Sequence, residues 1–387
     1  MQEDFHYYAT YCAAYLAGYT HEESLAIGYC SQMADCCSEA FLRRAGGPLQ
    51  AATTQTQIEL ADARTDLIGL QNITRIWASF HFLPAYLDVS LPRRTRRYMN
   101  KYRLICDTNS ALLKDTVTQV RGQGLQACGL AMHVLADTWA HRYFAGTPSY
   151  VINNAGNFRE LRCEDGEETQ MPIRFRHNPT SPDDVDKGLY TNTIYQNSEN
   201  SIMNLGHGRA GHLPDYSYAR YIFMPSWGGY SDILKDNPAD YYLAFCQMIY
   251  AMRYLRGEHE TFETGVYDEE AAAAWKEQIM RILKKRQPVA NDDWKALGEE
   301  MSGKKIDDFD LTAFLDEYTG APEEAKDDTF LGRFFLAAMA QKSLVTNRIF
   351  QSGNLLAGFS VDYDTFGFRG IKEYSRLIMR RMRRADS

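Results

Sequence analysis

The stretch Gly122–His141, GQGLQACGLAMHVLADTWAH, is unusually apolar and carries the strongest functional signal in the sequence. Before its last residue, His133 and Asp137 are the only side chains that ionise near neutral pH, and His141 ends the stretch. A spacing of four residues advances an α-helix by only about 40°, so these three side chains share one stripe. The stretch therefore predicts a buried helix whose only polar feature is this stripe.

Helical periodicity extends to both sides of this stretch. Residues 4–17 form an apolar, Tyr-rich helix that ends at Gly18, and Thr20–Glu23 has the spacing of a capping box. Further helices are expected over residues 20–43, 55–70, 74–82, 100–118, 121–144, 239–256, 269–286, 310–317, 329–349 and 371–384. We therefore predict an all-α fold, a multi-helix bundle.

One region breaks the helical pattern. Residues 146–205 are rich in Asn, Gly, Asp and Pro, with a short alternation at Met171–Phe175 that is typical of a β-hairpin. We interpret this region as an irregular insertion in a helical metal-binding domain of residues 1–290. Residues 291–387 are predicted to form a C-terminal helical extension packed on the same domain.

Composition and charge exclude several classes of protein. The 387 residues have a formal net charge of −8, so we expect no broad attraction to anionic membranes and no specific binding of nucleic acid. No apolar run reaches the roughly 18 residues of a membrane span, and Met1–Asp4 lacks the pattern of a secretory signal. The expected location is the cytoplasm. The eight Cys residues form no C-x-x-C pair and read as reduced cysteines, mostly within the core.

The polar stripe needs a partner. Burying one carboxylate and two imidazoles without compensation costs several kcal/mol, and a zinc-type ion suits all three. A hydrogen-bonded His-Asp-His network is the alternative reading. Similar candidates occur elsewhere in the sequence, and a site with several metal ions needs ligands from several helices. The predicted metal ligands are His6, Asp35, His81, His133, Asp137, His141, His207 and His212.

The loop Gly206–Asp215 strengthens this reading because it combines three Gly and a Pro with His207, His212 and Asp215. Glycines let the backbone come close to an ion or ligand. Asp215, like Asp4 beside His6, is a carboxylate that could act as a general base.

These features resemble the zinc-dependent phospholipase C and fungal single-strand nuclease superfamily. The blocks Asp4–Thr10 and His133–Gly146 look more closely like an uncharacterised bacterial family, over most of the chain. The superfamily resemblance implies a helical fold, three zinc ions and phosphoester cleavage. Carried over by position, it assigns a paired-metal group, an N-terminal ligand and a second-metal group. The paired-metal group is Asp35, His81, His133 and Asp137. The N-terminal ligand is His6, and the second-metal group is His207, His212 or Asp215.

Two departures from the superfamily are visible. Its members bind zinc through the amine of a processed N-terminal Trp, whereas this chain begins Met1-Gln2. The His that follows the Asp is also more distant in the superfamily than His141 is from Asp137.

The working hypothesis is a hydrolase in which two or three Zn²⁺ ions, or other divalent transition metals, activate water against a small-molecule or lipid phosphoester. Two alternatives remain open, a non-catalytic metal-binding or sensor protein with a closed site and a zinc amidase-type hydrolase.

Overall fold

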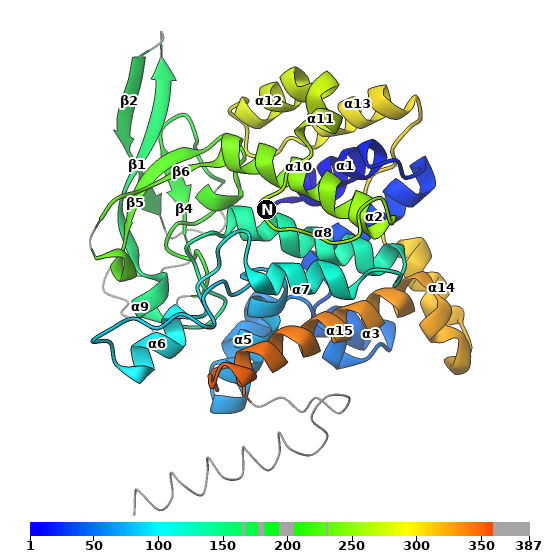
Figure 1. Ribbon diagram of the computed structural model, residues 1–387, viewed down its shortest axis with the longest axis horizontal. Coiled ribbons are helices and arrows are strands. Elements are labelled where there is room, and N and C mark those ends of the chain that lie inside the picture. The colour runs from blue at the N-terminus through cyan, green and yellow to red at the C-terminus, as the bar shows by residue number, and fades with distance from the viewer. Residues whose placement is uncertain (165–166, 177–181, 193–204, 230, 359–387) are drawn as a thin grey trace, which may run out of the picture.

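The computed structural model describes residues 1–164, 167–176, 182–192, 205–229 and 231–358 (Figure 1). The helix predicted over 371–384 lies outside these residues. The N-terminal part is helical. Its elements are η1 (Asp4–Ala9, a π-helix), α1 (Thr10–Leu16), α2 (His21–Cys36), α3 (Glu39–Ala45), η2 (Leu49–Ala51), α4 (Gln57–Ala63), α5 (Leu67–Phe80), α6 (Arg96–Tyr102), α7 (Ala111–Gln119) and α8 (Leu125–Ala140).

Strands dominate the middle of the chain. The elements are α9 (Tyr150–Asn153), β1 (Ala155–Glu164), β2 (Glu167–Pro172), β3 (Arg174–Arg176), β4 (Leu189–Thr191), η3 (Leu213–Asp215), β5 (Arg220–Pro225), η4 (Ser226–Gly228) and β6 (Ile233–Asp236). Helices return in the last part. They are α10 (Asn237–Leu255), α11 (Glu269–Ala272), η5 (Ala273–Trp275), α12 (Lys276–Lys284), α13 (Asn291–Ser302), α14 (Thr312–Gly320), η6 (Glu323–Asp328) and α15 (Phe330–Gln351).

The prediction of an all-α fold is wrong, because the protein is mixed α/β. Strands in the order β2-β1-β5-β6 form a four-stranded antiparallel sheet, and β3 and β4 form a parallel pair. The alternation at Met171–Phe175 belongs to a larger assembly than a short hairpin, since β2 pairs with β1 and β1 pairs in turn with β5.

Local sequence patterns conceal this sheet for two reasons. All six residues of β2 are exposed, so the strand has no apolar side that would mark it. The second partner of β1 is β5, which follows about sixty residues later, as the pairing of Glu160 with Tyr221 shows. β5 itself alternates between half-buried and buried residues, but it is only six residues long.

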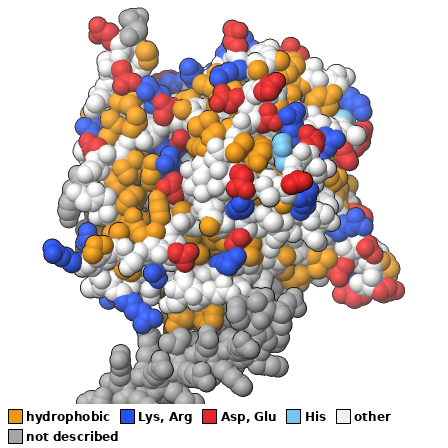
Figure 2. All heavy atoms as spheres, in the orientation of Figure 1, with side chains coloured by type: hydrophobic (Ala, Val, Ile, Leu, Met, Phe, Trp, Pro, Cys, Tyr) orange, Lys and Arg blue, Asp and Glu red, His pale blue; other side chains and the backbone are white. Residues whose placement is uncertain are grey.

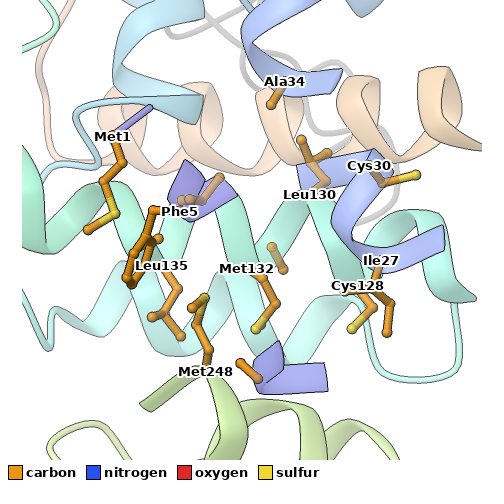
Figure 3. Packing of buried hydrophobic residues seen from close by; sticks show 14 of the residues in the cluster. Met1, Phe5, Ile27, Cys30, Ala34, Cys128, Leu130, Met132, Leu135 and Met248 are labelled. Carbon is orange, nitrogen blue, oxygen red and sulfur yellow. The ribbon is translucent and has the colours of Figure 1, made fainter. Parts of the chain in front are cut away.

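Helix α8 is the centre of the helical part, and its burial is what the sequence predicted. Every residue from Ala127 to Ala140 is buried, and α2, α5, α7, α10 and α15 all contact this helix. Figure 3 shows Leu130, Met132 and Leu135 of α8 packed among side chains from several of these elements. Such packing fixes the rotation of α8, and therefore the direction of its polar stripe.

The closest of these contacts joins α8 to α2. A Cβ atom on Gly129 would lie 2.3 Å from the carbonyl oxygen of Ile27 and 2.7 Å from the Cβ of Cys30. Only glycine allows the two helix backbones to approach so closely, which brings the end of α2 beside the polar stripe of α8.

A second apolar cluster lies between the sheet and the helices. It contains Phe158, Tyr221 and Phe223 of the sheet together with Phe82 and Phe144 from the segments that follow α5 and α8. This cluster also contains Ala210, Leu213 and Tyr216, and so holds the described part of the loop before β5 against the end of α8. The sheet therefore positions part of the candidate site.

Three further findings concern the surface, the helices and the cysteines. Acidic, basic and apolar side chains are intermixed on the face drawn in Figure 2. Among the described helices, none combines the length and the apolar character that a membrane crossing requires. The eight cysteines are free, and those that are not buried are Cys36 and Cys163.

Candidate metal centre

Asp137 lies at the middle of the site, and both of its carboxylate oxygens have close neighbours. Its Oδ2 lies 3.1 Å from His81 Nδ1 and 3.3 Å from His133 Nε2. Its Oδ1 lies 2.7 Å from the α-amine of Met1 and 3.2 Å from His6 Nε2. One buried carboxylate thus joins groups that come from η1, the end of α5 and α8.

The first of three ligand groups consists of Asp35, His81 and His133, beside Asp137 Oδ2. His81 Nδ1 lies 3.3 Å from His133 Nε2 and 3.7 Å from Asp35 Oδ1. With bonds of 2.0–2.1 Å, ligand atoms around a tetrahedral zinc ion lie roughly 3.3 Å apart. The spacing of these four side chains therefore fits one such ion.

The second group consists of His6, His133 and Asp137. The imidazole of His6 stacks on that of His133 with ring centroids 3.9 Å apart. His6 belongs to the π-helix η1, a type of turn that is frequent at functional sites. The group is sealed from solvent, since His6 and His133 are 0% exposed and Asp137 is 1% exposed.

The third group consists of His141, His207 and Asp215. His141 Nε2 lies 3.0 Å from Asp215 Oδ1, and His207 Nε2 lies 3.4 Å from Asp215 Oδ2. Both His207 and Asp215 belong to the loop between β4 and β5. In that loop Gly211 has a φ of +58°, and a Cβ there would lie 2.1 Å from the carbonyl oxygen of Thr191. The glycine therefore permits the tight path that turns His207 and Asp215 inward.

The outer nitrogens of three histidines donate hydrogen bonds to backbone carbonyls. His81 Nε2 donates to Thr53 O at 3.0 Å, His141 Nδ1 donates to His81 O at 2.6 Å, and His207 Nδ1 donates to Gly211 O at 2.7 Å. A carbonyl oxygen can only accept, so the outer nitrogen of each ring carries the proton. In the neutral ring the inner nitrogen then presents a lone pair to the cluster, as in a metal-ligating histidine.

Other buried nitrogens in the cluster have no hydrogen-bond partner among the described residues. They are both ring nitrogens of His6 and the Nδ1 atom of His133. His6 Nε2 does lie 3.2 Å from Asp137 Oδ1, as one member of an ion pair. Leaving buried polar atoms unpaired is costly, so these atoms favour an additional partner at this position.

The charge states fit a cation as that partner. Burial lowers the pKa of His6 and of His207 to about 4, which leaves both rings neutral near pH 7. Although burial opposes the charged form, the nearby histidines and the Met1 α-amine hold the pKa values of Asp137 and Asp215 well below their usual range. Anionic carboxylates beside the neutral imidazoles of His6 and His207 are a donor set that zinc binds, whereas at His81 burial is outweighed by the contacts with Asp137 and Asp35, which raise the pKa.

The α-amine of Met1 lies between the second and third groups. Besides Asp137 Oδ1, it is 3.3 Å from Asp215 Oδ1 and 3.4 Å from His141 Nε2. Burial opposes its charge, but Asp137, Asp215 and Asp35 raise its pKa to about 11. Patterns of His and Asp residues located the other groups, but such patterns cannot indicate a backbone amine. The chain also begins Met1-Gln2 where the superfamily has a zinc-binding Trp, so the sequence gave no reason to expect an amine at this site.

Most of the predicted site residues converge. The structure brings together His6, Asp35, His81, His133, Asp137, His141, His207 and Asp215. It does not bring His212 into any of the three groups. The His212 side chain is 57% exposed and lies 3.6 Å from Asp183, a carboxylate that the sequence analysis did not single out.

Asp4 is also outside the three groups. Its Oδ1 accepts a hydrogen bond from Phe5 N at 2.7 Å and its Oδ2 accepts one from Ala290 N at 3.1 Å. Burial, partly offset by these two hydrogen bonds, raises its pKa to about 6. In the structure Asp4 therefore anchors η1 to the start of α13.

The fold and the site define a mixed α/β protein with a buried centre of histidines and aspartates that can hold metal ions. The chain belongs to a family of unknown function (DUF6765), whose model matches residues 1–349. No curated protein and no solved structure matches it. Membership of an uncharacterised family is thus established, and the comparisons bring no support for the likeness to phospholipase C and the nucleases.

Proposed function

We propose that this protein is a metal-dependent hydrolase of phosphoesters that holds two or three zinc-type ions. The observation that carries the proposal is the convergence of eight histidine and aspartate side chains on three groups, with Asp137 and His133 shared between neighbouring groups. A metal ion beside Asp137 Oδ1 would pair with His6 Nε2, which has no hydrogen-bond partner among the described residues.

The residues divide among the ions by proximity. Asp35, His81, His133 and Asp137 would hold the first ion, and His141, His207 and Asp215 another. His6 and Asp137 Oδ1 would hold a further ion. Bound ions of this type polarise phosphoryl oxygens and lower the pKa of coordinated water, which is the chemistry that phosphoester hydrolysis needs.

The exposed edges of the cluster indicate where a substrate would approach. The Asp35 side chain is 30% exposed and that of His207 is 19% exposed, whereas His133 and Asp137 are sealed. Of the two carboxylates considered for proton transfer, Asp215 already faces His141 and His207. Asp4 has a pKa of about 6, but both of its oxygens accept backbone hydrogen bonds outside the three groups, so Asp215 is the better placed of the two. The choice of phosphoesters rests on the resemblance to zinc-dependent phospholipase C.

A second candidate is a closed metal-binding or sensor protein. Burial of the inner ligands favours it, and no candidate ligand lines either of two cavities formed by described residues. One of these, of about 310 Å³, lies between the segment at Pro84 and the end of α15. A zinc amidase-type hydrolase would use the same ions on a different substrate.

One experiment separates these candidates. Purified protein is analysed for metals, saturated with zinc, and assayed on an activated phosphodiester, a phosphomonoester, phospholipid vesicles, single-stranded DNA and an activated amide. The proposal expects at least two ions per chain and turnover of a phosphoester. Bound metal without any turnover would favour the closed site, turnover of the amide alone would favour the amidase, and absence of metal would exclude all three.

A further inference from the structure

The side chain of Asn237 lies behind the third ligand group, at the first residue of α10. Its Nδ2 atom is 2.8 Å from Leu213 O, 2.7 Å from Tyr216 O and 3.3 Å from Pro214 O. These carbonyls surround Asp215 in the short turn η3. A single buried amide group thus binds the backbone on both sides of a candidate metal ligand.

The chemistry of this contact requires an amide. Carbonyl oxygens only accept hydrogen bonds, so the NH₂ group of Asn237 must face them, and its two N–H donors are shared among three acceptors. Leu213 O and Pro214 O belong to the 3₁₀ turn, and Tyr216 O, just after it, also accepts a hydrogen bond from Ala219 N at 3.0 Å. An aspartate in this position would turn a carboxylate towards the same oxygens.

Two further features show that the contact is specific. Asn237 is 0% exposed, and its Oδ1 atom has no hydrogen-bond partner among the described residues. An unpaired buried acceptor costs roughly 1–3 kcal/mol, so the orientation of this side chain is determined by what Nδ2 holds. One turn further along α10, the hydroxyl of Tyr241 donates to Pro214 O at 3.0 Å.

We propose that Asn237 and Tyr241 are positioning residues that hold the carboxylate of Asp215 against His141 and His207, so that the third group is formed before metal binds. This inference rests on the proposed metal centre. Partners of metal ligands typically change metal affinity by about 10- to 100-fold when they are removed. Asn237 holds more of the turn than Tyr241 does, so its removal has the larger effect.

The test measures metal affinity rather than activity. Metal-free wild type, Asn237→Ala and Tyr241→Phe are titrated with Co²⁺, and each binding step is followed by its absorption and by elemental analysis. We expect one step to weaken by about tenfold or more in Asn237→Ala and by less in Tyr241→Phe, with the other steps unchanged. The same step should be the one that His207→Ala removes.

A double variant distinguishes positioning from a general loss of stability. In the His207→Ala background, Asn237→Ala should have no further effect on metal affinity, because the group it positions is already broken. Asn354→Ala is the matched control, since Asn354 is also 0% exposed and its Nδ2 donates to a backbone carbonyl, that of Asn100. It should leave every binding step as in the wild type.

Three results would overturn the inference. They are wild-type affinity at every step in a folded Asn237→Ala protein, an equal weakening of all steps, and a full effect of Asn237→Ala in the His207→Ala background. If Asn237→Ala does not fold, Tyr241→Phe takes its place. Wild-type metal affinity at every step in Tyr241→Phe would then overturn the inference. A wild type that binds no metal would overturn the proposed function together with this inference, whereas the other results leave the metal centre intact.

Discussion

Asp137 places its two oxygens in different surroundings, and this division organises the site. Oδ2 faces His81 and His133, and Oδ1 faces His6 and the Met1 α-amine. A carboxylate in this position can bridge two ions, whereas a neutral amide would offer one acceptor and turn a donor towards ring nitrogens that already need a cation. The charge at this position therefore matters more than its size.

The substitution Asp137→Asn tests this argument because it preserves shape and removes the charge. We expect the folded variant to lose at least half of the bound metal, since a ligand shared by two groups is lost. Elemental analysis gives the metal content, and circular dichroism verifies the fold. Asp115→Asn is the control, because Asp115 pairs with Arg348 on the surface and should be replaceable without loss of metal. Full metal content in Asp137→Asn would remove this residue from the site.

Individual ligands could be predicted where helical spacing decides their direction. His133, Asp137 and His141 occur once per turn on an apolar background, and their convergence follows from that pattern alone. His212 shows the limit of the same reasoning in a loop. It is five residues from His207 in a glycine-rich segment, but the loop turns it outwards to Asp183.

At the level of elements, the separation of α2 and α8 sets the first ligand group. Asp35 is near the end of α2, and His133 is on α8, so Asp35 reaches the group only if the two helices pack closely. Gly129 is the point of contact, with Ile27 O 2.3 Å from where a Cβ atom would be. The packing of α2 against α8 at Gly129 and the binding of metal by the first ligand group are therefore coupled.

We expect Gly129→Ala to destabilise the protein by about 1–3 kcal/mol, because overpacking forces the backbones apart. The same change should weaken metal binding. Chemical denaturation gives the free energy of unfolding, and Co²⁺ titration gives the affinity. Gly320→Ala is the control, since a Cβ at Gly320 meets no atom within 4 Å. Unaltered stability in Gly129→Ala would show that the helices can adjust and that their separation is not critical.

The sheet could not be predicted from helical periodicity. Its strands are short or exposed, and β1 and β5 pair across a long stretch of sequence, so no local window contains the pattern. The all-α prediction failed there for that reason. The helices themselves have strong local signals, such as the capping box at Thr20 and Glu23, which the structure confirms.

For the whole molecule, the buried ionisable groups predict how the metal-free protein responds to pH. His6 and His207 have pKa values of about 4 in the folded state, below the usual 6.5. Between pH 6.5 and 4 the unfolded chain therefore binds up to two more protons, and stability falls with pH by as much as about 2.7 kcal/mol per unit. Asp4, with its pKa of about 6, offsets roughly half of this loss below pH 6.

The Met1 α-amine acts at the other end of the pH range. Its pKa is raised from 8.0 to about 11, so its contribution is complete below pH 8 and is lost as the pH rises towards 11. We expect maximal stability of the metal-free protein between about pH 6.5 and 8, measured by urea denaturation across the range. The His207→Ala variant should show a smaller loss on the acid side. A flat profile from pH 5 to pH 9 would contradict these charge states.

Metal binding should tie distant parts of the chain together. The candidate ligands come from η1, α2, the end of α5, α8 and the loop before β5, which without metal are joined by packing and by polar contacts such as the hydrogen bond from His141 Nδ1 to His81 O. A ligand that binds only the folded state adds about 4 kcal/mol at a free concentration 1,000 times its Kd. Removing the metal with a chelator should therefore lower the Tm by several degrees, measured by calorimetry at pH 7.

Two comparisons make the measurement specific. Zinc added back to the chelated protein should restore the original Tm, and magnesium should not, because histidine ligands favour zinc over magnesium. The variant His81→Ala, which breaks the first group, should show a smaller Tm difference with and without chelator than the wild type does. His259→Ala, on a ring that packs against Tyr250 outside the cluster, should keep the full difference. An equal difference in all three proteins would mean that the chelator acts elsewhere than at the cluster around Asp137.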